Sequence, residues 1–159
     1  MKTFDQARLL DETGQRILIA LQENARLSYS ELGRIVGLSA PAVAERVRRL
    51  EEAGIITGYH ASVDPTKLGY AITAFVRISP IGERGEIGRV PALVRNLPEV
   101  LECHGITGTD SYILKVAVES VAHLGQLLQQ LEPFGHLNTS IILTTFVPRR
   151  ALAPRDGRT

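Results

Sequence analysis

The chain has 159 residues, 44% of them hydrophobic and 22% charged, which is typical of a soluble globular protein with one ordinary domain or two small ones. Its longest apolar runs fall short of the roughly 18 residues of a membrane span, and residues 1–10 lack the apolar centre of a signal peptide, so we expect a cytoplasmic location. A single cysteine excludes an intrachain disulfide or a thiolate metal cluster, and the net charge of +1 does not by itself indicate a nucleic-acid partner.

The first part of the chain is helical by pattern. Between Asp11 and Gly54 the apolar residues recur at helical spacing and predict three short helices. Asp11 is a suitable N-cap for the first helix, and Ser30 for the second.

A glycine turn separates the second and third helices. Gly37 supplies the positive φ of a tight turn, Ser39 can cap the third helix, and Pro41 lies in its first turn, where its missing N–H costs little. The buried face of this helix is predicted to consist of Val43, Val47 and Leu50. Three helices with a glycine turn in this place predict a helix-turn-helix.

After Gly54 the helical spacing of apolar residues ends. Residues 55–60 are predicted to form a short β-like wing, which closes a winged helix-turn-helix domain over residues 1–60. A linker is expected over 61–70, an α+β domain over 71–147, and a frayed basic tail over 148–159.

From Ala71 the apolar period changes to two. Strands are predicted at 71–78, 100–107, 112–119 and 136–147, with helices between about 88 and 97 and from 120 to 131. The order β-α-β-β-α-β is the ferredoxin-like (ACT-like) pattern. The fold class is therefore α+β, with an N-terminal winged helix-turn-helix before a ferredoxin-like βαββαβ domain.

The exposed side of the third helix suggests what it binds. Short side chains near its beginning let that end approach base edges, and arginines along it can reach bases or phosphates. The candidate DNA-binding residues, including two serines at helix starts, are Ser30, Ser39, Pro41, Ala42, Glu45, Arg46, Arg48 and Arg49. The alternative for the arginines is a solvated face paired with Glu45, Glu51 and Glu52.

At these residues the chain resembles the Lrp/AsnC family of leucine-responsive, or feast/famine, transcription regulators, from about Leu10 to Phe146. The resemblance is strongest over residues 37–51, in Gly54-Ile55-Ile56 and Gly58-Tyr59, and again in Glu102-Cys103-His104, Gly108 and residues 112–116. It implies a third helix that reads the major groove of a pseudo-palindromic operator. It also implies dimers formed through the C-terminal sheet, which assemble further into tetramers, octamers or larger rings.

The resemblance also places a small effector, usually an amino acid, near the Gly108 loop. Its candidate residues are Gly108, Thr109, Asp110, Ser111 and Tyr112, with Thr139 and Ser140 of the last strand as neighbours. A carboxylate here can receive the ammonium group of an amino acid, and loop N–H groups its carboxylate. The alternative is purely structural: Gly108 would be a turn residue, Asp110 the cap of that turn, and Tyr112 an aromatic at the edge of the core.

Two positions depart from the family pattern. Gly14-Gln15 stand where the family has an Asp-Arg pair, which predicts a slightly different start of the first helix. The acidic residue that usually precedes the loop aromatic is replaced by Ser111, and the carboxylate lies one position earlier, at Asp110.

Exposed apolar residues predict self-association. Phe75 on the outer face of the sheet, with Ile142, Leu143 and Phe146 on the last strand, gives more apolar surface than a monomer should expose.

Two other functions remain open. Proteins of similar architecture include tetrapyrrole decarboxylases, but no nucleophile-base or metal-ligand spacing stands out among the four histidines, so we expect no enzyme, cofactor or metal. The second is an architectural protein that wraps DNA with little sequence preference.

Overall fold

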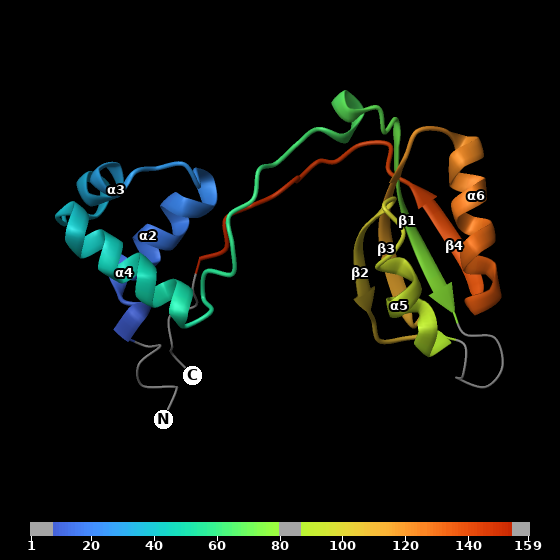
Figure 1. Cartoon of the computed structure of the whole chain (residues 1–159), viewed down its shortest axis with the longest axis horizontal. Helices are drawn as coiled ribbons and strands as arrows, with labels where there is room; N and C mark the ends of the chain where they lie inside the picture. The colour runs from blue at the N-terminus through green and yellow to red at the C-terminus, as the bar shows by residue number, and fades with distance from the viewer. Residues whose placement is uncertain (1–7, 80–86, 154–159) are drawn as a thin grey trace. The chain divides into compact units, whose positions relative to one another are not determined.

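The computed structural model describes residues 8–79 and 87–153. Contacts between residues divide the chain into two units, and the N-terminal unit combines Met1–Ala61 with Val147–Thr159, whereas the C-terminal unit is Ser62–Phe146 (Figure 1). None of the helices in the described residues is long and apolar enough to cross a membrane.

The N-terminal unit is a cluster of three helices, α2 (Glu12–Glu23), α3 (Tyr29–Val36) and α4 (Ala40–Glu52). As predicted, α4 buries Val43, Val47 and Leu50. They share one apolar core with α2 and α3, whose buried members include Ile17, Leu21, Leu32 and Val36. This core sets the position of α4, and so decides which of its side chains face outward.

The helix starts confirm one predicted cap and correct another. The Asp11 carboxylate accepts a hydrogen bond from the Gly14 N–H, as expected of an N-cap. However, α3 is capped by Ser28 and not by Ser30, because Ser28 and Glu31 form a capping box in which each side chain accepts from the other's backbone N–H. Ser30 lies exposed in the first turn of α3.

The turn between α3 and α4 is the one predicted. Gly37 has φ 74°, a left-handed conformation that favours glycine. Ser39 occupies the N-cap position of α4, but its side chain makes no capping hydrogen bond.

The predicted β-like wing is not a strand. The backbone N–H groups of Ile55 and Ile56 both donate to the carbonyl of Leu50, so the chain first completes the end of α4. Both isoleucines then pack, partly buried, against the helical core. This packing explains their apolar character without a sheet.

The C-terminal unit has the predicted βαββαβ order. Its strands are β1 (Ile72–Ser79), β2 (Val100–Gly105), β3 (Tyr112–Val118) and β4 (His136–Ile141), and its helices are α5 (Val90–Val94) and α6 (Val121–Leu131). Short 3₁₀ turns occupy Pro65–Leu68, Ile87–Arg89 and Glu132–Phe134. The strands form one antiparallel sheet in the order β2-β3-β1-β4, which confirms the ferredoxin-like prediction.

One face of this sheet is covered and the other is open. Ala74, Val76 and Ile78 of β1 are buried in a core that also includes residues of α5 and α6. Phe75 and Arg77, which alternate with them, belong to the opposite face, and Phe75 is 38% exposed.

The last strand is shorter than predicted, because strands end where their partners end. β4 stops at Ile141, opposite Ala74, and Ile142 adds one more hydrogen bond to Thr73. Since β1 begins at Ile72, residues 144–147 have no strand beside them. β2 likewise ends at Gly105 and β3 at Val118, one or two residues before the predicted limits.

Candidate DNA-binding surface and effector loop

Arg46 joins α4 to the start of α2. Its two Nη atoms each donate to one oxygen of the Asp11 carboxylate at 2.8 Å. The same carboxylate caps α2, and the hydrogen bond from Arg46 is the main reason that the pKa of Asp11 is lowered. The sequence placed Arg46 on the exposed face, whereas the structure gives it a partner within the unit.

Arg48 and Arg49 are paired along α4 itself. Arg49 Nε donates to Glu45 at 2.7 Å, and Arg48 donates to Glu45 and also to Glu52. These hydrogen bonds, first from Arg48 and then from Arg49, lower the pKa of Glu45 to about 2. The paired face considered as an alternative therefore describes Arg48 and Arg49, with Glu45 and Glu52 as the carboxylates.

The beginning of α4 is small and open. Ser39 and Pro41 are exposed and Ala42 is half-buried, so this end presents no long side chain. Within the described residues the Ser39 hydroxyl has no hydrogen-bond partner. It is thus free to donate to an outside acceptor, as the sequence suggested.

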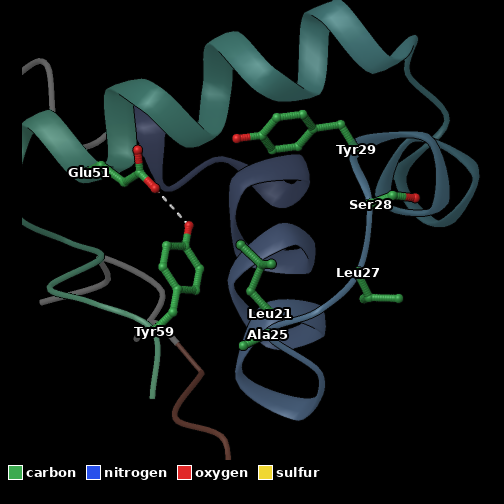
Figure 2. Close-up of a pocket in the computed structure, with 7 residues that line it drawn as sticks. All are labelled: Leu21, Ala25, Leu27, Ser28, Tyr29, Glu51 and Tyr59. Atoms are coloured by element: carbon green, nitrogen blue, oxygen red, sulfur yellow. Dashed lines mark hydrogen bonds between the residues drawn. The ribbon is translucent and has the colours of Figure 1, made fainter. Parts of the chain in front are cut away.

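A shallow pocket of about 360 Å³ lies elsewhere on the N-terminal unit. It is lined by Leu21, Ala25, Leu27, Ser28, Tyr29, Glu51 and Tyr59, and Figure 2 shows the Tyr59 hydroxyl bonded to the Glu51 carboxylate. This 2.8 Å bond fixes the segment after α4 to the helix, and burial, followed by Glu51, raises the pKa of Tyr59 to about 12. None of its residues was a predicted ligand contact.

The candidate effector loop, residues 106–111, connects β2 to β3. The Ile106 N–H donates to the carbonyl of Ser111, and the Ser111 N–H donates to Ile78 of β1 at 2.8 Å. The Asp110 carboxylate accepts from the Ser79 hydroxyl at the end of β1. Gly108, at φ 117°, makes the turn, so it has a structural role whatever else the loop does.

The tip of this loop carries unused donors. Within the described residues, the N–H groups of residues 107–110 make no hydrogen bond. Gly108 and Thr109 are exposed, while Asp110, Ser111 and Tyr112 are half-buried. The predicted loop residues thus form one turn, which contains both these unbonded amides and the Asp110 carboxylate.

Thr139 and Ser140 do not join this group within one chain. They pair with Val76 and Phe75, whereas the residue of β4 opposite Ser79 is His136. At about 3.3 Å per residue, Thr139 lies about 10 Å along the sheet from the position next to the loop. The pattern could not show this, because it gave the strand but not its register.

Two residues of these sites were missed by the sequence reasoning. Ser79 directly follows the predicted strand 71–78 and was given no role, and Asp11 was predicted only as a helix cap. A sequence signal existed for neither, because both interactions join residues more than 30 positions apart. No cluster of three or more histidine, cysteine or acidic side chains suited to a metal occurs in the described residues.

Known families match both halves of the chain. A family model for winged helix-turn-helix DNA-binding domains matches residues 10–57, and the model of the Lrp/AsnC ligand-binding domain matches residues 73–152. The HTH-type transcriptional regulator YezC of Bacillus subtilis is 40% identical over 136 residues, which cover 86% of this chain and 95% of that protein.

Solved structures agree in sequence and in fold. The feast or famine regulatory protein of Mycobacterium tuberculosis, complexed with L-methionine, is 35% identical with a TM-score of 0.84, covering 91% of this chain and 99% of that one. A transcriptional regulator of Neisseria meningitidis, also complexed with L-methionine, is 30% identical with a TM-score of 0.84, covering 90% and 96%. The chain belongs to the Lrp/AsnC family of DNA-binding transcription regulators.

Proposed function

We propose that this Lrp/AsnC regulator binds double-stranded DNA through the beginning and the arginine face of α4, and that an amino acid held at residues 106–111 alters this binding. The observation that carries the effector proposal is the loop itself, where the backbone N–H groups of residues 107–110 make no hydrogen bond within the described residues and Asp110 supplies a carboxylate. Two relatives of the same fold, complexed with L-methionine, support the same ligand class.

An amino acid matches this loop by charge. Its carboxylate can accept from the free N–H groups of residues 107–110, and its ammonium group can donate to Asp110. Ser79 already donates to one Asp110 oxygen, which holds the carboxylate in place. A ligand shifts the DNA-bound population only if it favours one assembly over another, so this loop must change on assembly or on DNA binding.

For DNA, the small residues at the start of α4 allow close approach to base edges. Ser39 can donate to a phosphate, and Arg49 can exchange the exposed Glu45 carboxylate for a phosphate or a base. Arg46 is less suited, because its pair with Asp11 also caps α2.

A second copy of the chain is proposed to cover the open face of the sheet. Phe75 lies there with its cross-strand partners Lys115 and Ser140, and the adjacent Ile113 is only half-buried. We expect a dimer or a higher even-numbered assembly, with a pseudo-palindromic target site. A stable monomer of 17.4 kDa in sedimentation at micromolar concentration would contradict this.

The effector proposal is tested by thermal unfolding with each of the twenty amino acids. A ligand of the folded state raises the melting temperature, and at 100 times its Kd it adds about 2.7 kcal/mol. We expect a rise with at least one amino acid, a loss of that rise in Asp110→Ala, and an unchanged rise in the matched variant Glu119→Ala, an exposed acidic residue at the end of β3. An undiminished rise in Asp110→Ala would place the effector elsewhere.

DNA binding is tested with Arg49→Ala against Arg95→Ala, an exposed arginine of the C-terminal unit. Removal of an arginine that contacts a base typically weakens specific binding about fivefold to over a hundredfold. Only Arg49→Ala should do so, and equal affinities for both variants would remove Arg49 from the DNA-binding surface.

A further inference from the structure

The segment that follows the C-terminal unit in sequence returns to the N-terminal unit. The strap, defined here as Val147–Ala153, follows β4 in sequence, and Figure 1 shows it beside the helical unit to which it belongs. The sequence had predicted only a frayed basic tail here.

One side chain holds this strap. Gln22 Nε2 donates to the carbonyl of Leu152 at 3.0 Å, and the Leu152 N–H donates back to Gln22 Oε1 at 2.9 Å. The same Nε2 also donates to Leu18 of α2, which fixes the amide on the helix. A single amide thus satisfies both backbone groups of one residue, in the manner of a neighbouring strand.

The strap changes the charge of the unit. Within residues 8–61, seven arginines are matched by seven acidic residues, so this part carries no net charge. The strap adds Arg149 and Arg150 and no acidic residue.

These two arginines differ from those of α4. Both are exposed, and within the described part of the chain neither makes an ion pair or a side-chain hydrogen bond. Arg46, Arg48 and Arg49, in contrast, are each bonded to a carboxylate of the same unit.

We propose that the strap is a second DNA-contacting element, in which Gln22 holds the backbone and Arg149 and Arg150 bind phosphates of the DNA backbone. This inference rests on the DNA binding of the N-terminal unit and adds a contact outside the helix-turn-helix. An arginine without a partner releases counterions from the DNA when it binds a phosphate, which favours binding. An arginine that must first leave a carboxylate contributes less to the affinity, because its existing ion pair is lost.

The test is the salt dependence of binding to a fluorescent DNA duplex of random sequence, because non-specific binding is almost wholly electrostatic. Removing one arginine–phosphate pair reduces the magnitude of the negative slope of log K against log salt by about 0.9. Near 0.1 M salt this corresponds to a roughly eightfold loss of affinity. The full chain is compared with the double variant Arg149→Ala/Arg150→Ala and with Lys67→Ala/Arg95→Ala. The control pair removes the same charge from exposed positions of the C-terminal unit.

We expect the slope of the strap variant to be less steep than that of the wild type by about 1.8 per chain, and the control variant to keep the wild-type slope. Gln22→Ala should abolish the hydrogen-exchange protection of the Leu152 amide and weaken DNA binding severalfold. Its matched control is Gln129→Ala, an exposed glutamine of α6.

The contrary results are distinct. An unchanged slope in the strap variant, or an equal fall in the control, would overturn the binding of phosphates by the strap. Full Leu152 protection and wild-type DNA affinity in Gln22→Ala would overturn the role of Gln22. If the wild-type chain does not bind duplex DNA at all, the failure belongs to the DNA-binding function itself and not to the strap.

Discussion

Replacing Arg46 with alanine removes the only side chain that, among the described residues, bonds α4 to the N-cap of α2. Asp11 then keeps its bond to the Gly14 N–H but loses both bonds from Arg46. We therefore expect Arg46→Ala to lower the stability of the N-terminal unit, whereas Arg49→Ala, at a position 60% exposed, should leave it nearly unchanged.

The expected loss of folding stability has two separable parts, the Arg46–Asp11 ion pair and the N-cap of α2. The side chains of Arg46 and Asp11 are 33% and 42% exposed, so the pair belongs with the partly exposed ion pairs and should contribute about 0.5–1 kcal/mol. Loss of an N-cap costs typically about 1 kcal/mol. Asp11→Ala should then cost about 1.5–2 kcal/mol, and Asp11→Asn, which retains a capping side chain, about as much as Arg46→Ala.

The assay is unfolding of the full chain followed by helical circular dichroism, since the chain has no tryptophan. Wild type, the two single variants and the double variant Asp11→Asn/Arg46→Ala form a double-mutant cycle. A coupling near zero, or an Asp11→Asn variant as unstable as Asp11→Ala, would refute the reasoning.

The same pair predicts a pH dependence. Because Arg46 lowers the pKa of Asp11 in the folded chain, its contribution is complete above the ordinary value of 3.8. It is lost as the pH falls through the lowered pKa. The difference in stability between wild type and Arg46→Ala should therefore vanish in acid and be constant at neutral pH.

Three further changes test other features. Gly37→Ala should cost about 1 kcal/mol in thermal unfolding, because φ 74° is left-handed although open space surrounds the residue. Gly135→Ala should cost about 1–3 kcal/mol, because its Cβ would lie 2.1 Å from the Ser79 carbonyl oxygen; an unchanged melting temperature would contradict that packing. Glu45→Gln should tighten binding to random-sequence DNA, because it removes the carboxylate that pairs with Arg49 and leaves Arg48 paired with Glu52 alone, whereas weaker binding would mean that Glu45 contacts a base.

What the sequence predicted well is what depends on neighbours in the chain. Periodicity identified the buried face of α4, and Gly37 the turn before it, because both are set by residues within a few positions. The second cap was wrong although its signal was present: Ser28 with Glu31 three residues later is a capping box, and Ser30 has no such partner.

What it missed depends on distant parts of the chain. Asp11 and Arg46 are 35 positions apart, and Gln22 and Leu152 are 130 apart, so no local pattern records either interaction. The end of β4 depends on where β1 begins. The β-branched residues after Ile141 therefore led to a predicted strand that was too long. A helical pattern shows which residues point outward, but not which of them already have a partner.

The partners of the arginines suggest how their work is divided. Arg46 makes two bonds to a carboxylate that is itself fixed by a helix N-terminus, so moving it to DNA would disturb α2. Among the residues that the structure describes, Arg49 pairs with Glu45 alone, at an exposed site where water and salt already compete, and it can exchange partners with little effect on the fold. Arg149 and Arg150 need no exchange, because within the described residues they have no partner to leave. These arginines therefore differ in how easily they can bind DNA, from Arg46, which stabilises the fold, to Arg149 and Arg150, which are available. We expect DNA affinity to depend on the available arginines, although the sequence pattern does not distinguish them from the others.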